Sequence, residues 1–369
     1  MNSQFCTVHN FRRTAVLALL LLSAAVCAQA GSITTVASTV PSNGDINPYG
    51  VAVVPTSTGS LTRGNILISN FNNSMNLQGT GTTIVQISPS GTVSLFAQID
   101  VNHLPGSCPG GVGLTTALVA LKTGWVIVGS LPTTDGSAST AGSGCLLVLD
   151  SHGSVVETFF GSLINGPWDM TAFDGGANVS LFVTNVLNGT VAGGGNVVKG
   201  GTVLRLDLSI SASSMPGLQS MTVIGSGFSE RTDPAALVIG PTGVGLGRRG
   251  EDDNNPTLYV ADSLNNRIAA ISDPLSRTSS AGTGATVTKG GSLNDPLGLI
   301  VTPGGNIVTV NGNNGLAVVT KPSGHQVFQT LLDSSGSPPG SGALFGLAFV
   351  PGQGLYFVDD AQNNLNLFH

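Results

Sequence analysis

The sequence predicts an all-β protein, a six-bladed β-propeller with four antiparallel strands in each blade. Three observations predict this fold. A short unit, in which an apolar strand ends in Asn or Asp before an Asn-rich turn, returns six times along the chain. Charged residues make up only 9% of the chain and Gly numbers 52, which suits short strands joined by tight turns. The units spread over the whole length, so each can cover the apolar faces of its neighbours in one closed ring.

Residues 1–30 are predicted to be a secretory signal peptide outside this ring. Arg12 and Arg13 precede an uncharged apolar run over residues 15–26, and Ala28-Gln29-Ala30 has small residues where signal peptidase cleaves. The run is too short for a permanent membrane span. We therefore expect cleavage near Ala30, a single propeller domain over residues 31–369, no membrane insertion after cleavage, and a secreted or periplasmic protein.

Residues 32–38 alternate polar with apolar side chains and stand before the first blade. The last repeat begins at residue 344 and holds only three strands by His369. Residues 32–38 are therefore predicted to supply the missing outer strand of the sixth blade. Pairing the two chain ends in this way closes the ring and covers strand edges that would otherwise be open.

The blades are expected to open at turn and proline signals along the chain. The expected openings are Pro48, Gly113-Leu114, Pro167, Asp233-Pro234, Asp295-Pro296 and Leu344. The third blade is expected to end around residues 221–224, shortly before the fourth begins.

In five repeats the second strand ends in a residue with a side-chain oxygen. These residues are Asn70, Asn185, Asp262, Asn311 and Asp359. The sixth copy, residues 125–129, lacks the polar terminus. Equivalent repeat positions occupy equivalent places in a propeller, so we expect the five to form a polar ring near the upper mouth of the central channel.

Two of the repeats carry a family resemblance. Residues 258–268, LYVADSLNNRI, and residues 295–310, DPLGLIVTPGGNIVTV, resemble the NHL repeat, and the other four copies match it in outline. The NHL pattern is Pro-x-Gly-apolar-Ala, then Gly-Asn-apolar-Tyr-Val-Ala-Asp, then Asn-x-Arg-Ile. The resemblance implies a six-bladed propeller. It says little about activity, because that fold hosts binders, hydrolases and lyases alike.

A more distant similarity concerns six-bladed lactonases and gluconolactonases of the senescence-marker-protein type, which hold a divalent cation at the channel mouth. By that resemblance Asn185, Asp262, Asn311 and Asp359 are candidate ligands for Ca²⁺ or Zn²⁺, and the metal would activate water for ester or lactone opening. Those enzymes place a Glu at the start of a first strand, where this chain has none. Asp169 is the nearest substitute and is a candidate catalytic residue. The alternative is that the ring residues cap the turns that follow them.

Other side chains have a functional and a structural interpretation. His103, in the loop entering the second blade, is a candidate base or a surface histidine. The aromatic residues at blade entries, Tyr49, Trp168 and Phe345, are candidates for ligand stacking or for packing between blades. Long connections over residues 131–144 and 187–201 suggest recognition loops or disorder. An acidic run, Glu251, Asp252 and Asp253, suggests a solvated loop or a calcium contact.

The two cysteines that remain after signal removal are predicted to form a disulfide. Cys108 precedes the first strand of the second repeat and Cys145 opens its third strand, and these points lie on the same rim of a propeller. An even pair in an oxidising compartment is typical of a disulfide.

The net charge of the chain limits the kinds of partner that it can bind. Without Arg12 and Arg13 the chain has 11 basic against 19 acidic residues, and the basic residues are scattered singly. Nucleic acid is excluded as an expected partner, because no basic stripe is available to neutralise phosphates.

The sequence shows no convergent nucleophile, acid and base, and no Gly-x-Ser-x-Gly motif. We therefore expect a monomeric, non-catalytic binding or scaffold module whose ligand is a protein, a peptide or a carbohydrate. The alternative is a divalent-metal-dependent lactonase or esterase with its site at the mouth of the central channel.

Overall fold

The computed structural model describes residues 31–211, 214–247 and 255–369. The predicted signal peptide and the acidic residues Glu251, Asp252 and Asp253 lie outside these residues. Within them the regular structure is β-strand apart from two short 3-10 helices, η1 (Ala138–Thr140) and η2 (Ser263–Asn265). No helix in this part of the chain has the length and apolar character that a membrane crossing requires.

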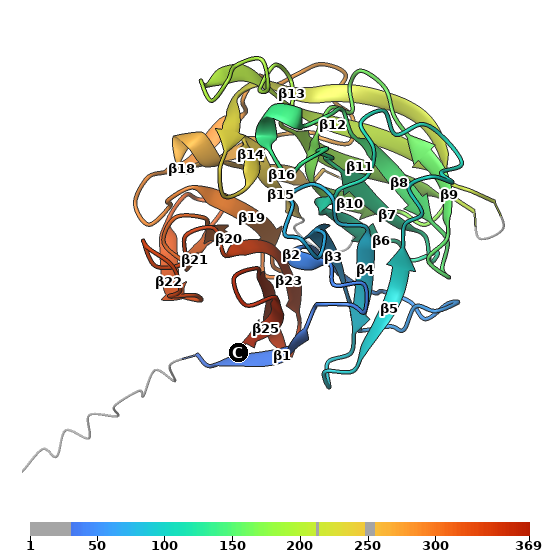
Figure 1. Ribbon diagram of the computed structural model, residues 1–369. Helices are drawn as coiled ribbons and strands as arrows, with labels where there is room; N and C mark the ends of the chain where they lie inside the picture. Colours follow the sequence, from blue (N-terminus) through green and yellow to red (C-terminus); the bar gives the residue numbers. More distant parts are fainter. Residues whose placement is uncertain (1–30, 212–213, 248–254) are drawn as a thin grey trace, which may run out of the picture. The chain divides into compact units, whose positions relative to one another are not determined.

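The strands form six antiparallel sheets, the blades, and confirm the predicted fold class (Figure 1). Blade one contains β2 (Ile46–Val53), β3 (Ile66–Asn72), β4 (Thr83–Ile87) and β5 (Val93–Gln98). Blade two contains β6 (Leu114–Ala120), β7 (Val126–Ser130), β8 (Cys145–Leu149) and β9 (Val155–Phe159). Blade three contains β10 (Pro167–Asp174), β11 (Asn178–Asn185), β12 (Val198–Ser209), β13 (Gly217–Asp233) and a short fifth strand, β14 (Leu237–Ile239).

The other three blades have four strands each. Blade four contains β15 (Pro241–Gly247), β16 (Thr257–Asp262), β17 (Arg267–Ile271) and β18 (Ala285–Lys289). Blade five contains β19 (Pro296–Val301), β20 (Ile307–Asn311), β21 (Leu316–Thr320) and β22 (Gln326–Leu331). Blade six contains β23 (Leu344–Val350), β24 (Gly354–Asp359), β25 (Asn364–Phe368) and β1 (Ile33–Ser38).

The first strand of each blade lines the centre of the ring. Each contacts the first strands of both neighbouring blades, in the order β2, β6, β10, β15, β19, β23 and back to β2. Glycine makes this close approach possible. A Cβ on Gly298 would lie 1.8 Å from the carbonyl oxygen of Phe345 in the next blade, and one on Gly346 would lie 2.1 Å from the carbonyl oxygen of Tyr49. Any larger residue would push the inner strands apart.

Apolar clusters fill the spaces between blades. Leu146 of blade two, for example, packs in one buried cluster with Leu181 and Leu204 of blade three. Each sheet therefore has both faces covered by its neighbours, which is why the strands read as nearly continuous apolar runs.

The N-terminal strand closes the ring, as predicted. β1 pairs with β25 from Ile33 opposite Phe368 to Ser38 opposite Asn364, and it is the outermost strand of blade six. Backbone hydrogen bonds between Ser32 and His369 extend the pairing in both directions, at 2.8 and 3.1 Å. The two strands lie side by side at the lower edge of Figure 1.

The predicted boundary between blades three and four is wrong. β13 continues to Asp233, well beyond residues 221–224, and turns back as β14, so that blade four begins at Pro241 and not at Asp233-Pro234. The reason is the apolar segment Ala236–Ile239, which is buried and forms a hairpin with the end of β13 before the chain enters the next blade. This β13–β14 hairpin is an addition to the repeat.

The predicted disulfide is present. Cys108 and Cys145 are joined with their Cα atoms 5.2 Å apart, and they tie the loop before β6 to the start of β8. Cys145 is fully buried.

Candidate functional site

The ring positions occur in all six blades. In each blade the polar residue near the end of the second strand pairs with a residue at the start of the first strand. The pairs are Asn70 with Pro48, Ser130 with Leu114, Asn185 with Pro167, Asp262 with Pro241, Asn311 with Pro296 and Asp359 with Leu344. The prediction that the second repeat lacks a polar residue at the end of this strand is therefore wrong. The strand was expected to end at Gly129, but β7 continues to Ser130.

The ring side chains are buried and act within turns. None of the six exposes more than 5% of its surface. Asn185 Oδ1 accepts a hydrogen bond from the backbone N–H of Asn165 at 2.9 Å, and Asn311 Nδ2 donates to the carbonyl of Ser292 at 2.7 Å. Ser130 Oγ likewise bonds the loop that enters its own blade. These contacts hold each entry loop against the second strand, which is the turn-capping interpretation.

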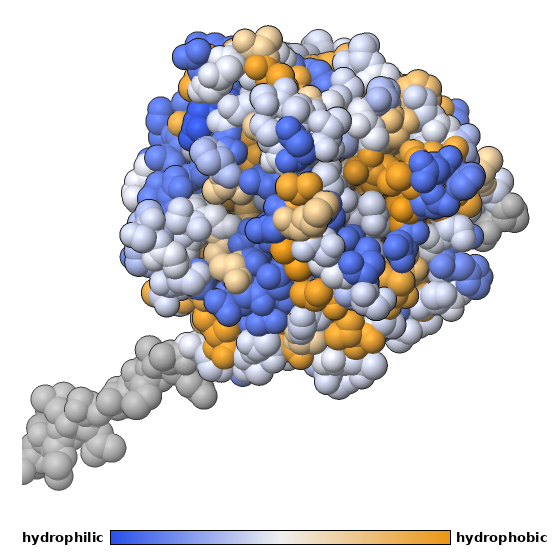
Figure 2. Space-filling view, viewed as in Figure 1, coloured by the Kyte–Doolittle hydropathy of each residue, from blue (hydrophilic) through white to orange (hydrophobic). Residues whose placement is uncertain are grey.

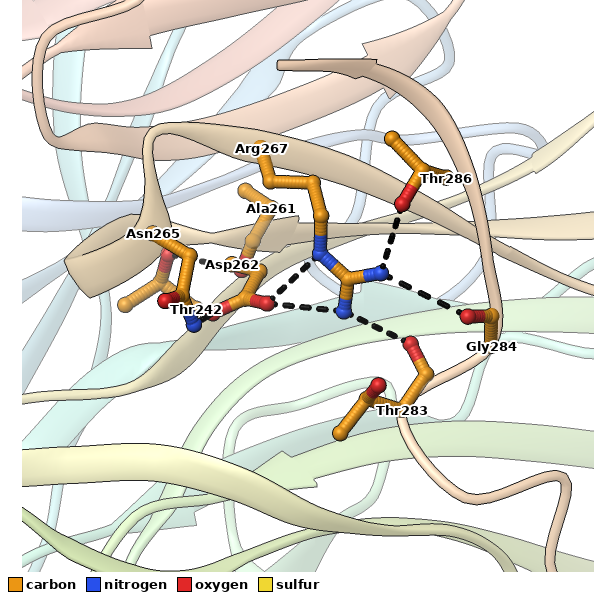
Figure 3. Close-up of polar contacts among 8 residues, drawn as sticks. All are labelled: Thr242, Ala261, Asp262, Asn265, Arg267, Thr283, Gly284 and Thr286. Carbon is orange, nitrogen blue, oxygen red and sulfur yellow. Dashed lines mark hydrogen bonds and ion pairs between the residues drawn. The ribbon is translucent and has the colours of Figure 1, made fainter. Parts of the chain in front are cut away.

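Asp262 makes a buried ion pair (Figure 3). Its Oδ2 accepts from both Nε and Nη2 of Arg267 at 2.8 Å, and its Oδ1 accepts from the side-chain amide of Asn265 at 2.8 Å. Arg267 also donates to the carbonyls of Thr283 and Gly284 and to the hydroxyl of Thr286. Both oxygens of this candidate metal ligand are thus committed to its own blade.

The asparagines that follow the ring join neighbouring blades. Asn266 and Asn363 have left-handed backbones, with φ of 47° and 54°. Asn266 Oδ1 accepts from the N–H of Asp295 at 2.6 Å, and Asn363 Oδ1 accepts from the N–H of Asn47 at 2.7 Å. Asn tolerates this backbone conformation and bonds nearby N–H groups, so these residues connect blade four to blade five and blade six to blade one.

A divalent metal does not fit the ring. Asn70 and Asn311 each retain a buried amide oxygen without a partner. The oxygens of Asn185 and Asp262 already accept hydrogen bonds within the protein, so the ring falls short of the six to eight oxygens that Ca²⁺ takes. Among residues 31–211, 214–247 and 255–369, no three His, Cys, Asp or Glu side chains are grouped closely enough to hold a metal ion.

The upper mouth of the channel, where the first strands begin, is filled by aromatic side chains. Tyr49 stacks on Phe71 and Phe345, with ring centroids 4.4 and 3.9 Å apart, and Trp168 lies 6.2 Å from Phe345. Tyr49, Trp168 and Phe345 each expose 2% of their surface or less. The three therefore pack between blades, and none offers a ring face to solvent.

The β13–β14 hairpin covers this aromatic cluster. Leu237, Val238 and Ile239 are buried in the same cluster, and Trp168 Nε1 donates to the carbonyl of Val238 at 3.0 Å. The loop between the two strands reaches blade one, where Gln78 donates to the carbonyl of Pro234 at 3.0 Å. Figure 1 is seen from this upper face, with β14 and η1 in front of the ring. The two predicted long connections, residues 131–144 and 187–201, flank the hairpin, and the second ends earlier than predicted because β12 begins at Val198.

The lower part of the channel contains an open cavity of about 360 Å³, which we call the channel cavity. Residues from the first strands of all six blades line it. Each of these first strands is an edge strand of its sheet. The backbone N–H and C=O groups along its inner side therefore have no neighbouring strand to bond. The channel cavity therefore presents backbone N–H and C=O groups alongside apolar side chains such as Leu118, Met170 and Leu299.

Two side chains distinguish the channel cavity. Two residues after the first-strand residue that pairs with the ring position, four blades have glycine: Gly50, Gly243, Gly298 and Gly346. At this position blade two has Thr116 and blade three has Asp169, and both line the channel cavity. The Thr116 hydroxyl is buried without a hydrogen-bond partner. Sequence reasoning missed Thr116, although the break in the glycine pattern was visible.

Asp169 is held across two blades. Its Oδ1 accepts from the N–H of Met170 at 2.8 Å, and its Oδ2 accepts from the N–H of Val244 in blade four at 2.9 Å. Burial raises the pKa of this carboxyl to about 7, although the two N–H donors act in the opposite direction. Near the end of the cavity the backbone N–H of Lys122 donates to Asp174 Oδ2 at 2.7 Å.

His103 lies far from this arrangement. It is exposed in the loop between β5 and β6, and its Nδ1 lies 2.7 Å from Asp100 Oδ2. This hydrogen bond lowers the pKa of Asp100, together with the N–H of Asn102. His103 does not line the channel cavity. Its side chain is exposed, which agrees with the surface interpretation of His103 and leaves it without a place in the channel cavity.

No protein-family model matches the chain, and no curated protein matches its sequence. Solved structures share its fold. A gluconolactonase from Xanthomonas campestris aligns with a TM-score of 0.55 at 13% identity, over 92% of this chain and 89% of the other. Regucalcin from Agrobacterium tumefaciens, a calcium-binding protein, aligns with a TM-score of 0.53 at 12% identity, over 89% and 92%. Virginiamycin B lyase from Staphylococcus aureus aligns at 0.52 and 13% identity, over 92% and 99%.

These similarities show the fold. The chain is a six-bladed β-propeller similar to gluconolactonase, regucalcin and virginiamycin B lyase. At such identities a shared fold does not transfer an activity, because propellers host unrelated chemistries.

Proposed function

We propose that the protein is an exported, NHL-like binding module that takes a small ligand into the channel cavity without transforming it. One observation carries this proposal. The channel cavity is open and presents hydrogen-bonding groups, whereas the ring residues that suggested a metal site are buried in turn and loop contacts. A cavity of 300 to 1,000 Å³ with a few polar groups among apolar ones is typical of small-molecule sites.

The polar groups indicate the ligand's chemistry. Thr116 offers an unused hydroxyl, Asp169 offers the remaining lone pairs of its carboxylate, and the inner strand edges offer backbone donors and acceptors. Among the described residues that line the channel cavity there is no Phe, Tyr or Trp, so ring stacking does not contribute to binding. We expect a small neutral molecule with several hydroxyl or amide groups, which agrees with the carbohydrate option of the sequence analysis.

Export is part of the proposal. The paired arginines, the short apolar run and the small residues at 28 and 30 support it, and the disulfide suits an oxidising compartment. Amino-terminal sequencing of the exported protein should begin near Gly31.

A second candidate function is hydrolysis in the channel, and one observation favours it. Asp169 has a pKa of about 7, which is near the value a general base needs at neutral pH, and the fold is shared with gluconolactonase. Both oxygens of Asp169 already accept backbone N–H groups, and within the described residues no second ionisable side chain is hydrogen-bonded to it. If the protein is a hydrolase, its turnover of a substrate should be lost when Asp169 is replaced.

Binding can be tested with a library of small polyols, monosaccharides and amides, measured by ligand-observed NMR. Thr171 lines the channel cavity, so Thr171→Phe should abolish binding by filling it, and Thr116→Val should weaken binding by removing one hydroxyl. Thr222→Phe, on the outer strand β13, is the matched control and should bind like the wild type. A library without binders, or binders that Thr171→Phe does not affect, would refute the proposal.

A further inference from the structure

An open hollow of about 300 Å³ lies between blades five and six, and we call it the interblade groove. Its walls come from the second, third and fourth strands of blade five and from the first three strands of blade six. None of the residues that line it lines the channel cavity. Figure 2 shows hydrophobic residues at the surface along the lower edge of the view, where Figure 1 places β1 and β25 of blade six.

Two rows of apolar side chains face each other across the interblade groove. Residues directly opposite each other in paired strands present their side chains on the same face of the sheet, so strand pairing sets each row. The rows are Val308, Val319 and Phe328 in blade five, and Phe349, Leu355 and Phe368 in blade six.

The aromatic residues of these rows form the rim of the interblade groove. The ring centroids of Phe328 and Phe368 lie 6.4 Å apart across it. Phe328 exposes 51% of its surface and Phe349 exposes 37%. Exposed aromatic side chains around a hollow are typical of a binding groove, because a finished core would cover them.

The equivalent space between blades three and four is filled. When positions are matched through the strand pairing, the equivalent rows are Phe182, Arg205 and Thr222 in blade three, and Leu246, Leu258 and Ile271 in blade four. Phe182 is fully buried among the blade-four residues, at the position where blade five has the smaller Val308. The propeller itself therefore places apolar groups in this kind of space.

A loop completes the cover between blades three and four. Arg205 donates to the carbonyls of Pro274 and Arg277, in the connection between β17 and β18, and Leu275 of this connection packs against the buried cluster. In blade six the corresponding strands are β25 and β1, which are far apart in the chain, so no such loop joins them. Closing the ring with β1 thus leaves the interblade groove without this cover.

The walls of the interblade groove indicate the chemistry of its ligand. Of the described residues, no Asp, Glu, Lys or Arg lines it. The polar groups at its ends already have partners: Thr302 Oγ1 donates to the carbonyl of Asn306 at 3.2 Å, and His369 Nε2 lies 3.0 Å from Ser32 Oγ. A ligand therefore gains free energy by burying apolar surface, and the small volume restricts it to a small molecule.

We propose that the interblade groove is a binding site for a small neutral ligand with an alkyl chain. The chain lies between the two apolar rows, in the space that Phe182 fills between blades three and four. This site goes beyond the proposed function, because it shares no residue with the channel cavity.

Titration of the full propeller with 1-butanol, 1-hexanol and 1-octanol, followed by ligand-observed NMR, tests the site. Each added methylene should tighten binding about fourfold, because it buries more apolar surface. Val308→Phe introduces the ring that blade three has at this position and should weaken octanol binding about tenfold or more, because the ring occupies the groove. Gln329→Phe is the matched control, since it places the same ring on the other face of β22, and it should bind octanol like the wild type.

Two more variants keep the test decisive. Phe328→Ala removes one side of the rim without filling the core and should weaken octanol binding a few-fold, so the test does not depend on the folding of Val308→Phe. Thr171→Phe, which fills the channel cavity, should leave octanol binding unchanged.

Three results would overturn the proposal. Octanol might bind the wild type no more tightly than butanol does. Folded Val308→Phe and Phe328→Ala, checked by circular dichroism, might bind octanol as the wild type does, or Thr171→Phe might abolish binding. A dimer in light scattering that Phe328→Ala dissociates, without octanol binding, would assign the groove to a second copy of the chain instead.

Discussion

Asp169 stands at a position where four other blades have glycine, and its side chain bonds the backbone of the next blade. Its neighbour around the ring, Thr116, makes the same departure from glycine. A side chain at this position projects toward the channel cavity instead of allowing the closest approach of two strands. Thr116 and Asp169 therefore add two polar side chains to the channel cavity, which Thr171, Lys122 and Asp174 also line.

Asp169 should make stability depend on pH. Its pKa is about 7 in the folded protein, against about 3.9 in an unfolded chain, so the folded state binds the proton more tightly. Tighter proton binding by Asp169 stabilises the folded state fully below about pH 4, and this stabilisation is lost as pH rises through about 7. Asp295 and Glu230, also with pKa values raised to about 7 by burial, act in the same direction.

We predict that the free energy of unfolding falls between pH 4 and pH 8, and that Asp169→Asn makes this fall smaller by on the order of 4 kcal/mol. Urea unfolding of the wild type and the variant at several pH values measures this difference. An identical pH dependence in the variant would show that Asp169 is not perturbed.

The ion pair of Asp262 and Arg267 should be structural. Asp262→Ala leaves Arg267, which is only 8% exposed, without its carboxylate. We expect a loss of about 3 to 5 kcal/mol in the free energy of unfolding. The double variant Asp262→Ala/Arg267→Met should recover most of this loss, because no unpaired charge remains buried. A stable Asp262→Ala protein, within about 1 kcal/mol of the wild type, would contradict this role.

The β13–β14 hairpin is the element that most changes the repeat architecture. It closes the upper mouth of the channel through Trp168 and Pro234, and so leaves the lower channel cavity as the open end. Leu237 begins β14 with a positive φ of 62°, a strained conformation for a leucine, and its buried side chain explains why the strain is tolerated.

Trp168→Phe tests the hairpin. The variant keeps an aromatic ring but removes the donor to the carbonyl of Val238, so a buried acceptor loses its partner. We expect a loss of about 1 to 3 kcal/mol and faster amide exchange in β14 than in β21. Trp125→Phe is the matched control, since Trp125 Nε1 donates to the carbonyl of Ser211 in an exposed contact. Equal effects of the two variants would contradict the role of the hairpin.

For the whole molecule, ring closure is the feature on which the other elements depend. Removing residues 31–38 would expose the edge of β25 and uncover blade six. We expect this truncated chain to lose more than about 3 kcal/mol of stability and to associate with increasing concentration. A chain that starts at Gly31 is the control. Unchanged stability and a monomeric state, measured by thermal unfolding and light scattering, would contradict the closure.

Much of this architecture could be predicted from local pattern. The blade number, the closing strand at residues 32–38 and the disulfide follow from strand repeats and the positions of Cys108 and Cys145. The β13–β14 hairpin could not be predicted this way, because its strands resemble any other short apolar strand. One hint was present: Asn185 and Asp262 are 77 residues apart, whereas the next two spacings are 49 and 48.

The candidate site was less predictable than the fold. Asp169 was identified, but its place in the channel cavity depends on the sizes of side chains in six strands that are distant in sequence. Thr116 and Ser130 were missed because blade two departs most from the repeat. The ring residues were found correctly at strand ends, yet their hydrogen bonds depend on loop conformations that no local pattern specifies.

The most direct test of a binding module without catalysis is turnover. Wild-type protein and Asp169→Asn should be assayed side by side against a panel of lactones and aryl esters, with Ca²⁺ or Zn²⁺ added. We predict that neither protein hydrolyses any substrate faster than buffer with the same metal. Turnover by the wild type that disappears in a folded Asp169→Asn variant would contradict the proposal and establish a hydrolase.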